Sequence, residues 1–254
     1  MKSIAISDIH QDIWRVEELL KRETYDEIVF LGDWFDTHRR RQDSRTSGFG
    51  ETCDFLIWLI TQHENRNKFV FLPGNHDMAY IYMNHKRPTS PDNPYYSSGG
   101  SRTKIRTFQH KFAKVGKGDD FFLKHFRPFF QTQGYTLSHA GIHPRFCING
   151  VDTFKCHITE AWLNFRNVAH PHNNLIRDVG YSRGGDSPTG GILWLDWRDE
   201  YAPNTYVGKQ IVGHTSVAEA TVREFGTPTE AWDIDAGGYI VIENGNVKPK
   251  ELKS

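Results

Sequence analysis

The sequence predicts an α/β fold built from parallel β-α-β units, and two features of its first 80 residues carry this prediction. Short apolar runs alternate with segments of helical apolar spacing, an order typical of a parallel sheet with crossover helices. Each apolar run also leads into a cluster of Gly, Asp or Asn, so polar side chains would gather at one edge of the sheet. A chain of 254 residues suits one large α/β domain, and we expect a single domain over residues 1–254.

Five elements are expected in this first part of the chain. Apolar runs predict strands over residues 2–7, 27–31 and 69–72. Segments 13–21 and 51–63 repeat apolar side chains at helical spacing, which predicts a helix before and after the second strand.

The middle of the chain is less regular. Residues 85–102 are rich in Pro, Ser, Gly and Tyr and have no hydrophobic period, so they form either a substrate-facing lid or an ordinary surface loop. Helical spacing returns over 103–126, with a break at 116–118, and again over 157–168. A second irregular loop is expected over 170–191, and we place both loops near the active site.

Short apolar runs in the C-terminal half predict further strands. A strand is expected over 135–138, and others over 210–212, 231–234 and 239–243. The last three suggest a second sheet that packs on the first.

Composition bears on three properties of the protein: nucleic-acid binding, membrane spanning and cellular location. Lys plus Arg and Asp plus Glu both number 31, and this zero net charge argues against a nucleic-acid partner. The longest apolar stretch, residues 55–60, is far too short to cross a membrane. Residues 1–8 resemble a buried strand more than a signal peptide, so we expect a cytoplasmic protein.

The three cysteines also agree with the expected cytoplasmic location. They are odd in number and have no CxxC spacing, which predicts neither a disulfide framework nor a thiolate zinc site. A reducing compartment suits this pattern; the residues are Cys53, Cys147 and Cys156.

Five short clusters contain the residues best suited to chemistry. Their carboxylate, amide and imidazole groups suit divalent metals of the Mn, Fe or Zn type, and the lack of thiolates favours a catalytic over a structural site. One Asp-x-His alone would carry little weight, but five clusters that each follow an apolar run are a specific signal. The clusters are Asp8-Ile9-His10, Gly32-Asp33-Trp34-Phe35-Asp36, Gly74-Asn75-His76-Asp77, Ser138-His139-Ala140-Gly141 and Gly213-His214-Thr215.

In this order the clusters resemble the calcineurin-like metallophosphoesterase superfamily, whose pattern is D-x-H, G-D-x-x-D, G-N-H-[DE], H-[AG]-G and G-H. The sequences at 138–144, 193–196 and 233–238 look most like the branch of serine/threonine phosphoprotein phosphatases and diadenosine tetraphosphatases. The resemblance runs from Ile4 to about Gly238. It implies a four-layer α-β-β-α sandwich with two packed mixed sheets and a metal site at the C-terminal ends of the strands.

The resemblance also implies a role for each matching residue. Asp8 and His10 would hold a first divalent metal, and Asp33 would bridge both metals. The second metal would be held by Asn75, His139 and His214. The expected metal is Mn, with Fe, Zn, Ni or Co as alternatives, and a hydroxide shared by both metals would attack the phosphorus atom.

Two further residues are expected to act on the leaving group. His76 would protonate the leaving oxygen as a general acid, and Asp36 would orient His76 and favour its charged form. The alternative for Asp36 is a helix N-cap. For Asp77 we expect capping or support of the metal ligands.

The chain departs from the phosphoprotein phosphatases at the phosphate-binding arginine. Thr37 and His38 stand where that branch has Arg-Gly after the second aspartate. Another arginine would then bind the phosphate; we favour Arg198, and Arg183 is a second candidate. The run Arg39, Arg40, Arg41 and Arg45 is more typical of a solvated surface.

A second departure argues against nuclease activity. Ser216 occupies the position where nuclease-like members have a second histidine after His214. We therefore expect a dinuclear metal-dependent phosphatase acting on phosphomonoesters, with a phosphorylated protein, nucleotide or small molecule as substrate. The alternatives are a dinucleoside polyphosphate hydrolase, a phosphodiesterase or nuclease, and a scaffold that has lost catalysis.

Overall fold

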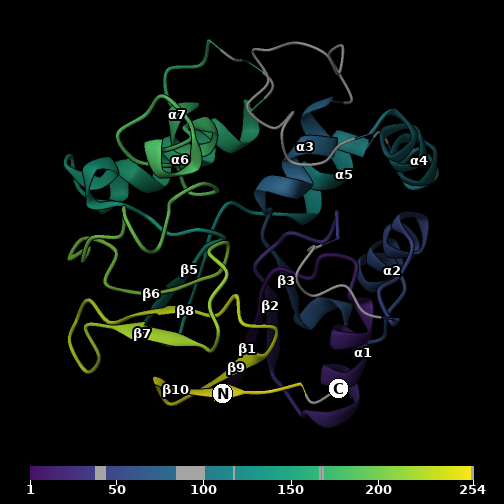
Figure 1. Ribbon diagram of the computed structural model, residues 1–254, viewed down its shortest axis with the longest axis horizontal. Coiled ribbons are helices and arrows are strands. Elements are labelled where there is room, and N and C mark those ends of the chain that lie inside the picture. Colours follow the sequence, from purple (N-terminus) through teal and green to yellow (C-terminus); the bar gives the residue numbers. More distant parts are fainter. Residues whose placement is uncertain (38–43, 84–100, 117, 166, 168, 253–254) are drawn as a thin grey trace.

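The computed structural model describes residues 1–37, 44–83, 101–116, 118–165, 167 and 169–252. Within them, the strands form two mixed five-stranded sheets, in the orders β10-β9-β1-β2-β3 and β4-β5-β6-β8-β7 (Figure 1). Strands β1, β2 and β3 run parallel in the first sheet, and β5, β6 and β8 run parallel in the second. The bounds are β1 Lys2–Ile6, β2 Glu27–Phe30, β3 Phe69–Phe71, β4 Phe130–Thr132, β5 Tyr135–Leu137, β6 Lys209–Val212, β7 Thr221–Arg223, β8 Ala231–Asp233, β9 Tyr239–Glu243 and β10 Asn246–Lys250.

The two sheets pack face to face through an apolar layer. Ala5 and Val29 of the first sheet lie in one buried cluster with Leu137 and Ile211 of the second. Side chains alternate along a strand, so the neighbours of Ala5 face the other way, toward the helices. The predicted α/β fold with two packed mixed sheets is confirmed.

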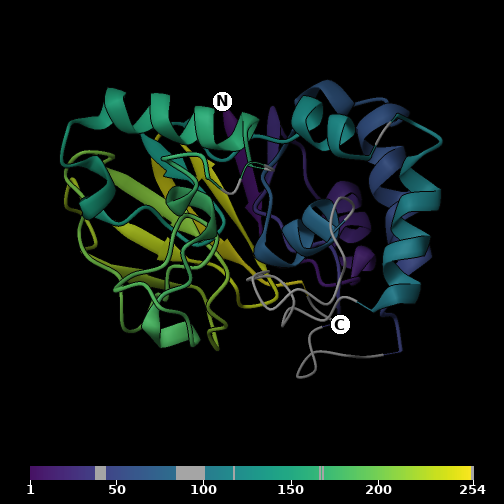
Figure 2. The same ribbon diagram turned by 90° about the horizontal axis from the view of Figure 1, so that it is seen from above.

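Helices cover the outer face of the first sheet. Ile4 and Phe30 from this sheet share a core with Val16 of α1 and Leu56 of α2. Figures 1 and 2 show α1 to α5 on this side, whereas α6 and α7 lie on the side of the second sheet. The bounds are α1 Ile13–Arg22, α2 Phe49–Thr61, η1 Arg66–Lys68, α3 Asn75–Met83, α4 Arg102–Phe112, α5 Gly118–His125, η3 Pro144–Cys147, α6 Val151–Leu163, α7 Asn174–Arg177 and η4 Tyr181–Arg183.

Most predicted elements are confirmed to within two residues at either end. This holds for the first three strands and for the helices over 13–21 and 51–63. The helical segment 103–126 is also confirmed as two helices, α4 and α5, on either side of the expected break.

The assignment of the last strands to one second sheet was wrong for β9. This strand pairs antiparallel with β1 and with β10, so both C-terminal strands extend the first sheet. The partner of a strand is set by long-range packing, which an apolar run by itself does not specify.

The helix predicted over 157–168 begins earlier and ends earlier, as α6. Its buried side chains Phe154, Ile158, Ala161 and Trp162 have helical spacing, and Gly150, with a φ of 95°, precedes its first residue.

Two further predictions concern loops. Residues 85–100 of the expected lid lie outside the described part of the chain, and the loop 170–191 contains α7 and η4.

Helix α3 was missed. Its apolar residues Met78, Ala79, Tyr80 and Ile81 are consecutive and all buried, so no amphipathic period marks it. Strands β4, β7 and β10 were also missed; two of them have three residues, and β10 is a largely exposed edge strand.

Candidate active site

The side chains predicted to bind metal follow the carboxyl ends of parallel strands. Asp8 follows β1, Asp33 follows β2 and Asn75 follows β3 in the first sheet. In the second sheet, His139 follows β5 and His214 follows β6. Parallel strands present their carboxyl ends at one edge, and the packed sheets bring both edges together. The structure therefore joins residues that are up to 206 positions apart, since the His214 backbone N–H donates to the Asp8 carboxylate.

One group of donor atoms surrounds the His10 imidazole. Its Nδ1 lies 2.8 Å from the backbone carbonyl of Asp36, which can only accept, so this nitrogen carries the proton. In the neutral ring, the lone pair of Nε2 is then directed toward Asp8 at 3.9 Å and Asp33 at 3.7 Å. Two carboxylates and an imidazole lone pair in one buried place form a donor set that fits a divalent metal ion.

A second group lies around Asn75 Oδ1. His139 Nε2 and His214 Nδ1 are each 3.0 Å from this oxygen. His139 Nδ1 lies 2.7 Å from the Leu31 carbonyl and therefore carries the proton. Burial lowers the pKa of His139 to about 3, so the ring is neutral and Nε2 presents a lone pair to another acceptor. Two acceptors at this distance repel each other, and a cation between them would remove the conflict.

Asp33 is common to both groups. Its Oδ2 lies 3.7 Å from His10 Nε2 and 3.6 Å from His139 Nε2. Burial raises the pKa of Asp33 well above its usual range, and the neighbouring Asp8 adds to the rise. A buried acid that resists ionisation in this way is a place where bound cations would be strongly favoured.

His76 lies beside the first group and contacts Asp36. Its Nδ1 is 3.2 Å from Asp36 Oδ2, and a ring nitrogen of His76 lies within 4.8 Å of donor atoms of His10 and Asp33. Burial lowers the pKa of His76, but the charges of Asp33 and Asp36 outweigh it, and without a bound cation they raise the pKa to about 9. The geometry allows His76 to donate a proton or to bind a metal.

Asp36 has two partners that the sequence analysis missed. Its Oδ1 accepts hydrogen bonds from the Tyr80 hydroxyl at 2.6 Å and from Lys104 Nζ at 2.5 Å. Tyr80 lies on α3 and Lys104 on α4, and neither belongs to a motif that would mark it in the sequence. The carboxylate thus links His76 and Tyr80 of α3 to Lys104 of α4.

The backbone of the site is strained. Asp8, His10, Asp33, Asp36 and His214 all have φ angles between 47° and 71°, in the left-handed region that non-glycine residues seldom adopt. Such conformations cost about 1–3 kcal/mol each and persist where the surrounding structure enforces them. Their concentration at these five residues indicates that the loops are shaped for the site.

Two glycines allow the backbone to approach the carboxylates closely. A Cβ atom on Gly74 would lie 2.1 Å from Asp33 Oδ1, and one on Gly213 would lie 2.2 Å from Asp8 Oδ2. Any side chain at either position would displace a predicted metal ligand. This explains why glycine precedes Asn75 and His214 in their clusters.

Asp77 connects the second and third clusters. Its carboxylate accepts hydrogen bonds from the backbone N–H groups of Gly74 and Asp33, both at 2.9 Å, and from that of Trp34 at 2.8 Å. The side chain thereby fixes the loop after β2 against the N-terminus of α3, which agrees with the expected supporting role.

The two candidate arginines differ in position. Arg183 Nη2 donates to Thr215 Oγ1 at 2.7 Å, beside His214, and its Nε lies 2.8 Å from Asp196. Burial is the largest cause that lowers the pKa of His214, and the positive charge of Arg183 is the second largest. The exposed Arg198 instead donates through Nη2 to the Ser216 carbonyl.

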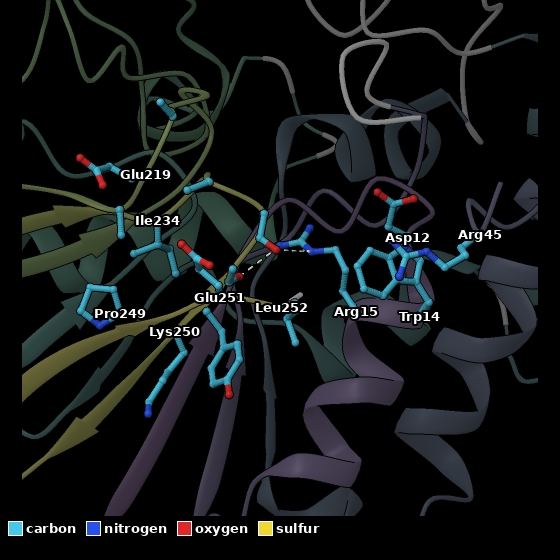
Figure 3. A pocket seen from close by; sticks show the side chains of 16 residues that line it. Asp12, Trp14, Arg15, Arg45, Glu219, Ile234, Pro249, Lys250, Glu251 and Leu252 are labelled. Atoms are coloured by element: carbon cyan, nitrogen blue, oxygen red, sulfur yellow. Dashed lines mark hydrogen bonds between the residues drawn. The ribbon is translucent and has the colours of Figure 1, made fainter. Parts of the chain in front are cut away.

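A cavity of about 530 Å³ lies beside the loop between β1 and α1 (Figure 3). Trp14 and Arg45 line one side, where the Arg45 guanidinium is 3.6 Å from the centre of the Trp14 ring. Arg15 lies between this pair and the C-terminal residues 249–252 (Figure 3). The buried Arg15 side chain donates to the carbonyls of Asp8 at 2.7 Å and Gly237 at 3.1 Å, and so ties a predicted ligand loop to the loop after β8.

Several other residues singled out in the sequence lie elsewhere. Trp34 of the second cluster is fully buried against Phe30 and Phe71, so it belongs to the core. His38 and Arg39 to Arg41 lie outside the described residues.

The fold and the two groups of donor atoms define a class of protein: an α/β protein whose Asp, Asn and His side chains converge to suit divalent metals at the carboxyl ends of strands. Residues 1–217 match the family of calcineurin-like phosphoesterases. The chain belongs to this family, as the resemblance in its motifs predicted, and the family implies a hydrolase. No curated protein sequence matches the chain closely enough to count as a relative.

Solved phosphatase structures share the fold at low sequence identity. A cold-active protein-tyrosine phosphatase from a Shewanella species is 14% identical with a TM-score of 0.64, over 98% of this chain and 80% of that one. A serine/threonine phosphatase from Saccharomyces cerevisiae, similar to human PP5, is 12% identical with a TM-score of 0.51, over 100% of this chain and 81% of that one.

No helix in the described part of the chain has both the length and the apolar character needed to cross a bilayer.

Proposed function

We propose that this protein is a metal-dependent phosphatase that hydrolyses phosphomonoesters. The observation that carries the proposal is Asp33 Oδ2, which lies within 3.7 Å of both His10 Nε2 and His139 Nε2. A carboxylate shared by two donor groups suits a pair of cations, with Asp8 and His10 on one side. The other side is formed by Asn75, His139 and His214.

Two divalent cations held by these residues would supply an acidified water and neutralise charge on the phosphoryl oxygens. We propose Mn as the preferred metal, because the mixed oxygen and nitrogen donors suit it, with Fe, Zn, Ni or Co as alternatives. The leaving oxygen is protonated by His76, whose Nδ1 faces Asp36 and whose orientation Asp36 maintains.

Arg183 is better placed than Arg198 to bind the substrate phosphate. It contacts Thr215 next to His214, whereas Arg198 is exposed and turned to the Ser216 carbonyl. An arginine presents a fork of N–H donors that matches phosphate, and a lysine presents only a point charge. We therefore assign the phosphate contact to Arg183.

The Arg183→Lys substitution tests this assignment. It should raise both KM and the inhibition constant of inorganic phosphate by about tenfold, since a hydrogen bond to a charged group contributes about 1.5–3 kcal/mol. The matched Arg198→Lys variant should stay within about twofold of the wild type. The reverse result would return the role to Arg198.

The proposed substrates are phosphoserine or phosphothreonine in proteins, or nucleotide-type phosphomonoesters. Diesters are the second candidate class, and Ser216 in place of a histidine argues against them because a hydroxyl is a weaker metal ligand than an imidazole. A scaffold without activity would be expected to lack ligands, and all six predicted ligands are present. A membrane or nucleic-acid partner is not part of the proposal, and the proposed location is the cytoplasm.

One panel of assays tests the function and the substrate class. The full chain, stripped by a chelator and then supplied with Mn, is assayed on phosphopeptides, a dinucleoside polyphosphate, a nucleoside monophosphate, 4-nitrophenyl phosphate and bis(4-nitrophenyl) phosphate. We expect hydrolysis of monoesters that depends on added metal and exceeds hydrolysis of the diester. Equal rates with and without metal would contradict the proposal, and faster diester hydrolysis would favour a phosphodiesterase.

A further inference from the structure

The two oxygens of the Asp36 carboxylate have separate partners. Oδ1 accepts from the Tyr80 hydroxyl at 2.6 Å and from Lys104 Nζ at 2.5 Å, while Oδ2 faces His76 Nδ1 at 3.2 Å. The side chain is only 6% exposed, so water cannot readily replace these partners. Turning the carboxylate would break two short contacts at once, and Oδ2 is therefore held toward His76.

Lys104 is itself well fixed. It lies in the first turn of α4, where its backbone N–H donates to the side chain of the N-cap residue Ser101 at 3.2 Å. Helix α4 packs against the core through Ile105 and Phe108. The ammonium group lies 5.7 Å from the centre of the Phe49 ring, and within the described residues Asp36 is the carboxylate that pairs with it.

A lysine at this place also changes the charge around the acid. Burial would raise the pKa of Asp36, but hydrogen bonds from His76, Lys104 and Tyr80 outweigh it and lower the pKa. Asp36 therefore stays ionised. With Lys104 removed, the carboxylate would keep one neutral partner on Oδ1 and would be freer to turn.

We propose that Lys104 is a positioning residue for the general acid, which fixes Asp36 so that His76 stays directed at the leaving group. The inference rests on the proposed phosphatase function, because it assigns proton donation to His76. Tyr80 assists by holding the same oxygen. Neither residue occupies a position in the five sequence clusters.

A direct contact between Lys104 and the substrate phosphate is the competing explanation. Thr37 has replaced the arginine that follows the second aspartate in phosphoprotein phosphatases, and a nearby lysine could supply the missing charge. The two roles predict different kinetics. A phosphate contact affects all monoesters and inorganic phosphate alike, whereas a misplaced acid affects only substrates whose leaving group needs the proton.

The test compares Lys104→Met and Lys104→Arg with Lys111→Met, all in the Mn-loaded full chain. Lys111 is a matched control because it lies on the same helix and pairs with Asp54, away from the site. For Lys104→Met, we expect kcat to fall about tenfold with phenyl phosphate and less than about threefold with 4-nitrophenyl phosphate. The KM and the inhibition constant of inorganic phosphate should not change, Lys104→Arg should restore most of kcat, and Lys111→Met should match the wild type.

Crystal structures of the wild type and of Lys104→Met supply a readout that does not depend on activity. We expect the contact between His76 Nδ1 and Asp36 Oδ2 to be lost or spread over several rotamers in the variant. An unchanged contact, or an equal loss of kcat for both substrates with a raised phosphate inhibition constant, would overturn the proposal. A wild-type protein without metal-dependent phosphatase activity would instead refute the proposed function, and the structures would still decide whether Lys104 holds Asp36.

Discussion

The Asp33→Asn variant should lose metal-dependent phosphatase activity by a factor on the order of 10³ or more. Asn has the same shape, but it presents one neutral oxygen where the carboxylate presents two charged ones, so it cannot bridge two cations well. Loss of several kcal/mol of stabilisation corresponds to a factor of this size in rate. The measurement is kcat on a phosphomonoester with saturating Mn, together with the bound metal per chain, which should fall.

In the metal-free protein, the Asp33→Asn variant should change how the melting temperature depends on pH. Burial and the charge of Asp8 raise the pKa of Asp33, so ionising this carboxyl group costs more free energy in the folded chain than in the unfolded chain. Its contribution to stability is therefore fully present below the pKa of the unfolded chain and is lost as pH rises through the raised folded pKa. In the metal-free protein, Asp33→Asn should weaken this fall in melting temperature with pH, and the increase produced by Mn should shrink.

The Asp152→Asn variant serves as the control, because Asp152 is an exposed residue in the first turn of α6. It should keep the activity and the metal content of the wild type. Full activity in Asp33→Asn would contradict the bridging role and would support a protein whose hydrolysis does not use this centre.

Replacing His76 with Gln should reduce kcat by about 10²- to 10⁴-fold on substrates with poor leaving groups, the usual contribution of a general acid. The loss should be at most about tenfold with 4-nitrophenyl phosphate, since that leaving group departs without a proton. Gln keeps a polar side chain of similar length but cannot donate a proton at neutral pH. The two substrates are assayed side by side with saturating Mn.

Metal content separates the two roles that the geometry allows for His76. As a general acid, its loss should leave the bound metal unchanged; as a ligand, its loss should remove metal and reduce activity equally on both substrates. His110→Gln is the control, because His110 is exposed on α4. A uniform loss with depleted metal would rule out the general-acid assignment.

Much of the site could be predicted because its residues occur in short clusters. A ligand such as Asp8 or Asn75 lies within a few residues of the end of a strand, and chain order along parallel strands already implies that such residues meet at one edge. The first three strands and helices α1 and α2 were predicted because their periodicity is local.

Other features depended on contacts that no local pattern encodes. Strand β9 pairs antiparallel with β1 in the first sheet, and the consecutive residues 78–81 of helix α3 are all buried, so no amphipathic period marks this helix. The pairing of Asp36 with Lys104 joins residues 68 positions apart, and the contact of Arg183 with Thr215 spans 32.

The sequence by itself determined the α/β class, the family and the set of six candidate metal ligands, because the chemistry of each cluster and its place after a strand are local properties. Only the tertiary structure decided which carboxylate oxygen lies between the two groups, which arginine lies beside His214 and which helix supplies a cation to Asp36. These follow from how two sheets and their helices pack. Side chains from distant segments meet only after that packing excludes water and fixes their distances.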